Sequence, residues 1–113
     1  MEPNIAFGTA DEVNSYINSD SSYIEINDVR GTTINATVIS SILDKCSANM
    51  EFTNDIIIAG TTSEVIDLLS RSKINSFTMS VVLSDAPTDS EIDTIFSNIT
   101  GTLESTLGQH SKY

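Results

Sequence analysis

Hydroxyl-bearing side chains crowd one short segment of this 113-residue chain, between residues 28 and 37. Three threonines in it, Thr32, Thr33 and Thr37, could accept a phosphate. They lie where an apolar pattern of helical spacing begins, so the sequence places them at the N-terminus of a helix. The backbone N–H groups and the positive dipole end found there favour an oxyanion or an added phosphate. We therefore predict Thr37, Thr33 and Thr32 as candidate phospho-acceptors.

The same segment carries polar groups that could contact a partner: Asp28, Arg30, Gly31, Asn35 and Thr37. A phosphate on one of the threonines would add about −1.5 to −2 charges and change docking through local charge. The alternative is that each threonine only caps the helix through its hydroxyl. The segment thus predicts a protein-docking loop that phosphorylation could switch.

Alternating strand and helix patterns position this segment. Strands are expected at 4–7, 23–27, 55–59 and 76–83, and helices at 9–17, 33–48, 61–71 and 88–107. Helix starts are marked by Thr9 and by two capping boxes, Thr61 to Glu64 and Thr88 to Glu91. Strand 55–59 is expected to be central with both faces covered, because its isoleucines are consecutive.

The order β-α-β-α-β-α-β-α with short connections predicts an α/β fold with right-handed crossovers. It would have a four-stranded, mostly parallel sheet with flanking helices. The sequence shows no internal repeat, so residues 1–113 are expected to form a single domain, in which 109–113 are a frayed tail.

The composition is strongly acidic, with 16 Asp and Glu against 5 Lys and Arg and a net charge of −11. Such a surface repels phosphate backbones and anionic lipids, so neither nucleic acid nor a membrane is an expected partner. No apolar run is long enough to cross a bilayer, and the N-terminus lacks the features of a secretory signal. The lone Cys46 falls on an apolar helix face, where it is expected to be buried. These features favour a cytoplasmic location.

The residues of common catalytic sites are scarce. No two of the five glycines have the spacing of a dinucleotide or phosphate-binding loop, and one His with one Cys makes no zinc site. His110 lies in the expected tail, so a Ser–His pair would need an ordered terminus. We predict no catalytic, metal or cofactor residues and expect a protein that is not an enzyme.

Three stretches carry a family resemblance: Gly8 to Val13, Ile24 to Val29, and Thr61 to Val65 followed by Leu68 and Leu69. In these stretches and in its element order, the chain resembles a STAS domain. That is the fold of anti-sigma-factor antagonists and of the small cytosolic partner of some lipid-transport ATPases. In the family's Asp-Ser-Ser/Thr-Gly-Leu motif the aspartate is replaced here by Asn35 and the glycine by Val38. Thr37 takes the place of the phosphorylated hydroxyl.

The resemblance implies a regulatory protein-binding module whose partner is an anti-sigma-factor or related kinase, or a transporter subunit. Two alternatives stay open. One is a small acidic decoy, such as a phage inhibitor, that binds a basic groove of a nuclease or defence protein. The other is an assembly subunit that forms homo-oligomers through an open sheet edge.

Overall fold

The computed structural model describes residues 4–71 and 79–111. Helices and strands both occur throughout these ranges, so the predicted α/β class is confirmed. Their order along the chain is β1 (Ile5–Gly8), α1 (Ala10–Tyr16), β2 (Tyr23–Ile26), β3 (Thr33–Asn35), α2 (Ala36–Lys45), β4 (Asn49–Phe52), β5 (Ile57–Gly60), α3 (Thr62–Leu69), β6 (Ser80–Leu83), α4 (Asp89–Phe96), β7 (Leu103–Ser105) and β8 (Gly108–His110).

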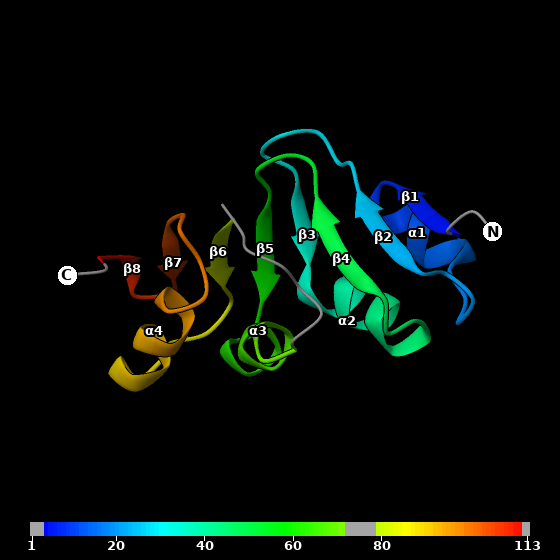
Figure 1. Ribbon diagram of the computed structural model, residues 1–113. Helices are drawn as coiled ribbons and strands as arrows, with labels where there is room; N and C mark the ends of the chain where they lie inside the picture. Colours follow the sequence, from blue (N-terminus) through cyan, green and yellow to red (C-terminus); the bar gives the residue numbers. More distant parts are fainter. Residues whose placement is uncertain (1–3, 72–78, 112–113) are drawn as a thin grey trace.

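The strands form two sheets, so the prediction of one four-stranded sheet is wrong. β1, β2 and β4 make a parallel three-stranded sheet. β3, β5, β6 and β7 pair in parallel, and β8 joins β7 in antiparallel fashion. The chain passes from the first sheet to the second through loops 27–32 and 53–56, which lie together along the upper side of the molecule in Figure 1.

Two short strands account for much of this difference. β3 and β4 have three and four residues, and both lie in or beside the predicted helix 33–48. In β4 a buried Met50 is followed by an exposed Glu51, which is the alternation of a strand. The helix itself is confined to α2, Ala36–Lys45.

The C-terminal part also differs from the prediction. The expected helix 88–107 ends at Phe96 with α4, and Leu103, which falls in the expected range, belongs to β7 instead. Residues 108–110 form β8, so the expected frayed tail is wrong for them. The predicted strand 76–83 is found as β6 over 80–83, and 76–78 lie outside the described residues.

The helix N-caps recur at a near-constant interval. They are Thr9, Asn35, Thr61 and Thr88, and 26, 26 and 27 residues separate them. Each helix contacts the next one along the chain, and the molecule is elongated, measuring 48 × 23 × 21 Å. Figure 1 shows the successive units side by side. The chain therefore has a structural repeat, which the sequence did not lead us to predict although three of the four caps share a Thr-x-x-Glu capping box.

Buried apolar side chains lie between the sheets and the helices and form one continuous core. Alternation sends every second strand residue into it, whereas helices contribute residues three or four apart. Its most buried large side chains are Ile24, Ile26, Ile39, Ile42, Met50, Ile58, Leu68, Met79, Ile95, Leu103, Val13 and Val65. Cys46 is buried as predicted, and its thiol donates to the carbonyl of Ser21.

Many of the acidic residues serve as helix caps. Glu12, Glu64 and Glu91 each accept a hydrogen bond from the backbone N–H of the N-cap threonine three residues earlier, at 2.8–2.9 Å. The three capping boxes are complete, so the predicted starts of α3 and α4 are confirmed. The bond from the Thr9 N–H, together with its hydroxyl, lowers the pKa of Glu12.

Asp85 caps α3 from the end of the neighbouring strand. Its carboxylate accepts hydrogen bonds from the Thr62 N–H at 2.8 Å and from the Thr62 hydroxyl at 2.6 Å. These bonds hold the pKa of Asp85 below its usual value of 3.8, and the bond from the hydroxyl has the largest effect. A lowered pKa in the folded state adds stability above the unfolded pKa, and this stability is lost as the pH falls through the folded pKa.

Asp85→Asn is therefore expected to unfold at a lower temperature than the wild type at pH 7. The gap should narrow as the pH falls below 3.8, because the wild type then loses its own charge-assisted bonds. Circular dichroism melts at pH 7 and at acidic pH measure the gap. Asp93→Asn removes an exposed carboxylate and should leave the gap near zero at both pH values. A gap for Asp85→Asn that is independent of pH would contradict the prediction.

The outer edge of β1 is covered from within the chain. The Tyr16 hydroxyl accepts a hydrogen bond from the Phe7 N–H at 2.7 Å and donates to the Phe7 carbonyl at 2.6 Å. These are the backbone groups of Phe7 that point away from β2. The bonds occupy the site where another strand would pair.

Candidate functional site

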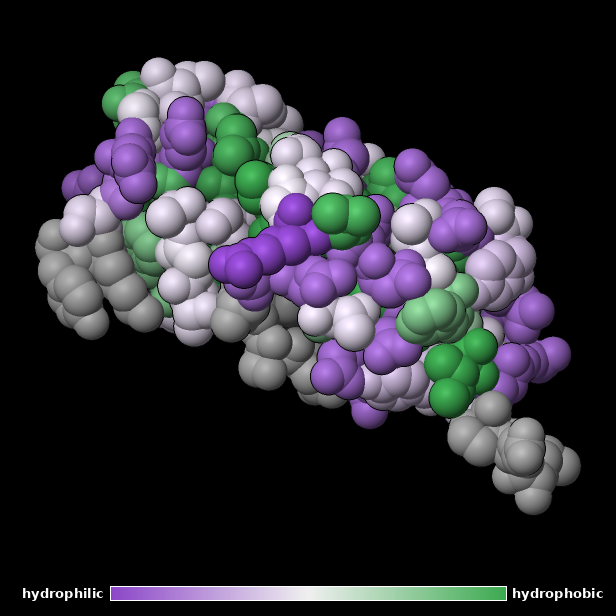
Figure 2. Space-filling view, turned by 90° about the horizontal axis from the view of Figure 1, so that it is seen from above, coloured by the Kyte–Doolittle hydropathy of each residue, from purple (hydrophilic) through white to green (hydrophobic). Residues whose placement is uncertain are grey.

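The predicted docking segment lies on the side of the molecule where the chain changes sheets (Figure 1). Residues 27–32, here called the crossing loop, connect β2 to β3, and Val29 and Arg30 lie in its middle. Val29 is 76% exposed and the side chain of Arg30 is 81% exposed. Figure 2, seen onto this side, shows hydrophilic side chains with apolar ones among them. The side chains of Val29 and Arg30 are therefore accessible from outside the molecule.

One hollow of about 230 Å³ lies beside the crossing loop. It brings together four of the residues predicted from the sequence with residues of α1 and α2. Its lining residues are Ala10, Asp11, Asp28, Thr32, Thr33, Ile34, Asn35 and Val38. Thr37, the fifth predicted residue near it, is exposed at the start of α2.

Asp28, which lines this hollow, makes two hydrogen bonds that connect neighbouring parts of the chain. Its carboxylate accepts a hydrogen bond from the Ala10 N–H, at 2.8 Å, and so caps α1 from the end of β2. Its backbone carbonyl accepts a bond from the Asn54 side chain at 2.9 Å. Asp28 therefore ties the crossing loop both to α1 and to loop 53–56.

Asn35 is the N-cap of α2. Its side-chain oxygen accepts from the Thr37 N–H at 3.1 Å and from the Thr37 hydroxyl at 2.9 Å. The Thr32 hydroxyl donates to the Val29 carbonyl at 2.6 Å. Two of the three candidate phospho-acceptors thus use their hydroxyls in local hydrogen bonds, but neither hydroxyl caps α2, whose N-cap is Asn35.

Thr33 is exposed, and its hydroxyl has no hydrogen-bond partner among residues 4–71 and 79–111. It lines the same hollow as Asp11 and Asp28. A phosphate on Thr33 would thus meet two carboxylates, whereas one on Thr37 would lie in the first turn of α2. Helix dipole and backbone N–H groups favour an anion only at the second position.

A second hollow, of about 440 Å³, lies on the other side of the crossing loop. It is lined by Arg30, Gly31, Asp55, Ile56, Ile57, Ser80, Thr100 and Gly101. Arg30 lies 3.8 Å from the Asp55 carboxylate, and the side chains are 81% and 48% exposed. An exposed pair at this distance contributes about 0–1 kcal/mol, so a partner can displace it at little cost.

The crossing loop is held in one shape by backbone bonds. The Gly31 N–H donates to the Asp55 carbonyl at 2.8 Å, and the Thr32 N–H donates to the Val29 carbonyl at 3.0 Å. Gly31 has a φ of 84°, a conformation that residues with a side chain rarely adopt. These bonds fix the position of Val29 and Arg30 without covering their side chains.

The C-terminal hairpin contains a pair that the sequence analysis set aside. Ser105 Oγ lies 2.6 Å from His110 Nε2, and the Leu107 N–H donates to the same oxygen at 3.1 Å. The expectation of an unordered His110 is wrong, because β8 pairs with β7 around Gly108. Ser105 is 8% exposed and lies outside both hollows, so its hydroxyl is placed to join the hairpin rather than to meet a substrate.

Within the described ranges, no group of three His, Cys, Asp or Glu residues could hold a metal ion. No described helix has the length and apolar character needed to cross a membrane. Comparisons with known protein families, with curated proteins and with solved structures give no match. The geometry of the chain itself is therefore the basis for a functional proposal.

Proposed function

We propose that this chain is a non-enzymatic, cytoplasmic protein-binding module that docks a partner through the crossing loop and the first turn of α2. The observation that carries the proposal is the exposure of Val29 and Arg30, at 76% for the residue and 81% for the side chain. Arginine is enriched at protein interfaces, and the exposed apolar side chain beside it adds area that a partner can bury.

The rigidity of the loop supports this role. Hydrogen bonds from Gly31, Thr32 and Asn54 hold it before any partner arrives. Binding by an ordered loop avoids the entropy cost of ordering it. The two flanking hollows give a partner's side chains concave places to enter.

A regulatory role is part of the proposal. Thr37 suits phosphorylation best among the three threonines, because it is exposed and lies in the first turn of α2. A phosphate there would add negative charge seven positions after Arg30 in the sequence, and would weaken the binding of an acidic partner or strengthen that of a basic one. The regulatory role and the Thr37 assignment also agree with what the STAS resemblance implies.

The two alternatives have less support. An acidic decoy needs carboxylates displayed to its target, whereas Glu12, Glu64, Glu91, Asp28 and Asp85 cap helices of this chain. An assembly subunit that pairs through β1 would have to displace the Tyr16 hydroxyl from the Phe7 backbone.

Val29→Glu tests the proposal. The change places a carboxylate at the centre of the proposed contact, and we expect it to weaken partner binding at least tenfold, because a buried unpaired charge is costly. The immobilised full chain and its variants are exposed to extract of the native host, and captured proteins are identified and titrated.

Leu107→Glu is the matched control, because Leu107 is 68% exposed in the β7–β8 turn, away from the crossing loop. A partner captured by the wild type and by Leu107→Glu but lost by Val29→Glu supports the proposal. A partner retained equally by all three proteins removes the crossing loop from the interface and overturns it.

A further inference from the structure

The three-stranded sheet has an outer face that points away from the core. It consists of Ile5 and Phe7 from β1, Tyr23 and Glu25 from β2, and Asn49 and Glu51 from β4. Residues between them, such as Ile24 and Met50, are fully buried, which fixes the direction of the others. Ile5 is 50% exposed and Phe7 is 52% exposed.

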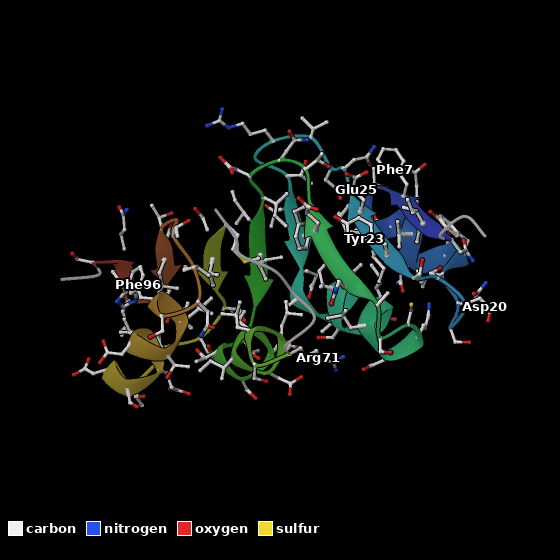
Figure 3. All side chains as sticks on the ribbon, in the orientation of Figure 1. Phe7, Asp20, Tyr23, Glu25, Arg71 and Phe96 are labelled. Carbon is white, nitrogen blue, oxygen red and sulfur yellow. The ribbon has the colours of Figure 1, made fainter. Side chains whose placement is uncertain are left out.

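The strand register arranges this outer face in two rows. Ile5, Tyr23 and Asn49 are neighbours in one row, and Phe7, Glu25 and Glu51 are neighbours in the other. Figure 3 shows Phe7, Tyr23 and Glu25 near one another at the end of the molecule that carries β1. Aromatic rings and carboxylates therefore lie side by side on one surface.

The Tyr23 hydroxyl donates a hydrogen bond to the Glu51 carboxylate. This bond raises the pKa of Tyr23 to about 12. The bond also holds the Tyr23 ring beside Glu51 of β4. Only one of the two carboxylate oxygens of Glu51 accepts from the Tyr23 hydroxyl. The ring and the carboxylate are thus fixed relative to each other before any ligand arrives.

Glu25 and Glu51 occupy directly opposite positions of neighbouring strands. Like charges so placed repel and destabilise a sheet. The three basic side chains in the described ranges bind elsewhere: Arg30 contacts Asp55, Lys45 contacts Asn14, and Arg71 contacts Asp44. A cation brought by another molecule would relieve the repulsion.

We propose that the outer face binds an arginine-rich segment of a partner protein. A guanidinium group can stack on an aromatic ring while its N–H groups reach a carboxylate, which matches Phe7 beside Glu25 and Tyr23 beside Glu51. Arginine fits better than lysine, because only the planar group does both at once. The inference concerns a surface other than the crossing loop and does not depend on the proposed function.

Charge decides between this occupant and others. A second copy of the chain would bring two acidic outer faces together, and a nucleic acid would bring phosphates to them. The segment cannot extend the sheet at the β1 edge, because Tyr16 occupies the backbone groups of Phe7 there.

A fluorescent peptide of six arginines, titrated into the full chain at 150 mM salt, tests the proposal. Glu25→Gln/Glu51→Gln is expected to weaken its binding at least tenfold. Phe7→Ala, which leaves the charge unchanged, is expected to weaken it about fivefold. A peptide of six lysines should bind the wild type more weakly than six arginines.

The matched control is Asp93→Asn/Glu104→Gln, which removes two exposed carboxylates from α4 and β7 at the other end of the molecule. It should change binding less than twofold, and Val29→Glu should not weaken it. Equal losses from both double variants, or no loss from Phe7→Ala, would show attraction by net charge alone and overturn the proposal. Unchanged melting curves confirm that each variant is folded.

Discussion

Ile58→Ala is expected to lower the free energy of unfolding by about 3–4 kcal/mol, the cost of emptying a fully buried isoleucine site. Ile58 is 0% exposed and lies in the middle of β5. Its strand pairs with β3 on one side and β6 on the other, with Ile34 and Val81 as the direct neighbours of Ile58. Neighbouring elements held on both sides cannot collapse into the vacated space, so the cavity term remains.

Urea unfolding followed by circular dichroism measures this loss, with the dependence on urea checked for a constant slope. Ile58→Val removes one methylene and should cost about 1 kcal/mol. Val82→Ala, at a 39% exposed position of the adjacent strand, should change stability by no more than about 0.5 kcal/mol. Equal losses at Ile58 and Val82 would contradict the central position of β5.

The predictions that succeeded depend on residues close together in the chain. The starts of α3 and α4 follow from a threonine and a glutamate three positions apart, and both capping boxes form. β5 is interior to its sheet as expected, since strands pair with it on both sides. Its outer face is less covered than consecutive isoleucines suggested, because Ile57 and Ala59 are half-buried.

The division into two sheets could not be predicted by the same means. A three-residue strand such as β3, with one buried side chain, is stabilised mainly by pairing with β5, whose matching residues lie 24 positions later. The pattern of apolar and polar residues within a short segment does not show which distant strand will pair with it. The predicted helix 33–48 therefore includes β3, and the sequence does not indicate that the chain changes sheets in the crossing loop.

In the candidate site, too, the residues close together in the sequence could be predicted, whereas the contacts between distant residues could not. Hydroxyls crowd segment 28–37, and its residues Asp28, Thr32, Thr33 and Asn35 do line one hollow. Ala10 and Asp11 of α1 line its other side. The Ala10 N–H donates to Asp28, which lies 18 positions later in the sequence. The outer face of the first sheet is still harder to predict, because each of its rows combines residues from three separate strands, β1, β2 and β4.

Gly101→Ala is expected to lower the free energy of unfolding by about 2–3 kcal/mol, because the methyl group has no room. A Cβ at Gly101 would lie 2.7 Å from the backbone carbon of Met79, close also to the Met79 carbonyl oxygen, and 2.6 Å from the Ser80 hydroxyl oxygen. Main-chain atoms cannot turn aside as a side chain can. The segment before β7 would therefore move away from the start of β6.

The displacement would act on specific hydrogen bonds. The Gly101 N–H donates to the Met79 carbonyl at 3.0 Å, and the Val81 N–H donates to the Thr102 carbonyl at 2.8 Å. Amide hydrogen exchange at Val81 should accordingly be faster in Gly101→Ala, in addition to the loss measured in urea. Thr102→Ala, at an exposed neighbouring position, should change stability by no more than about 0.5 kcal/mol. Wild-type stability in Gly101→Ala, with unchanged exchange at Val81, would mean that β6 and β7 are not packed as closely as their pairing requires.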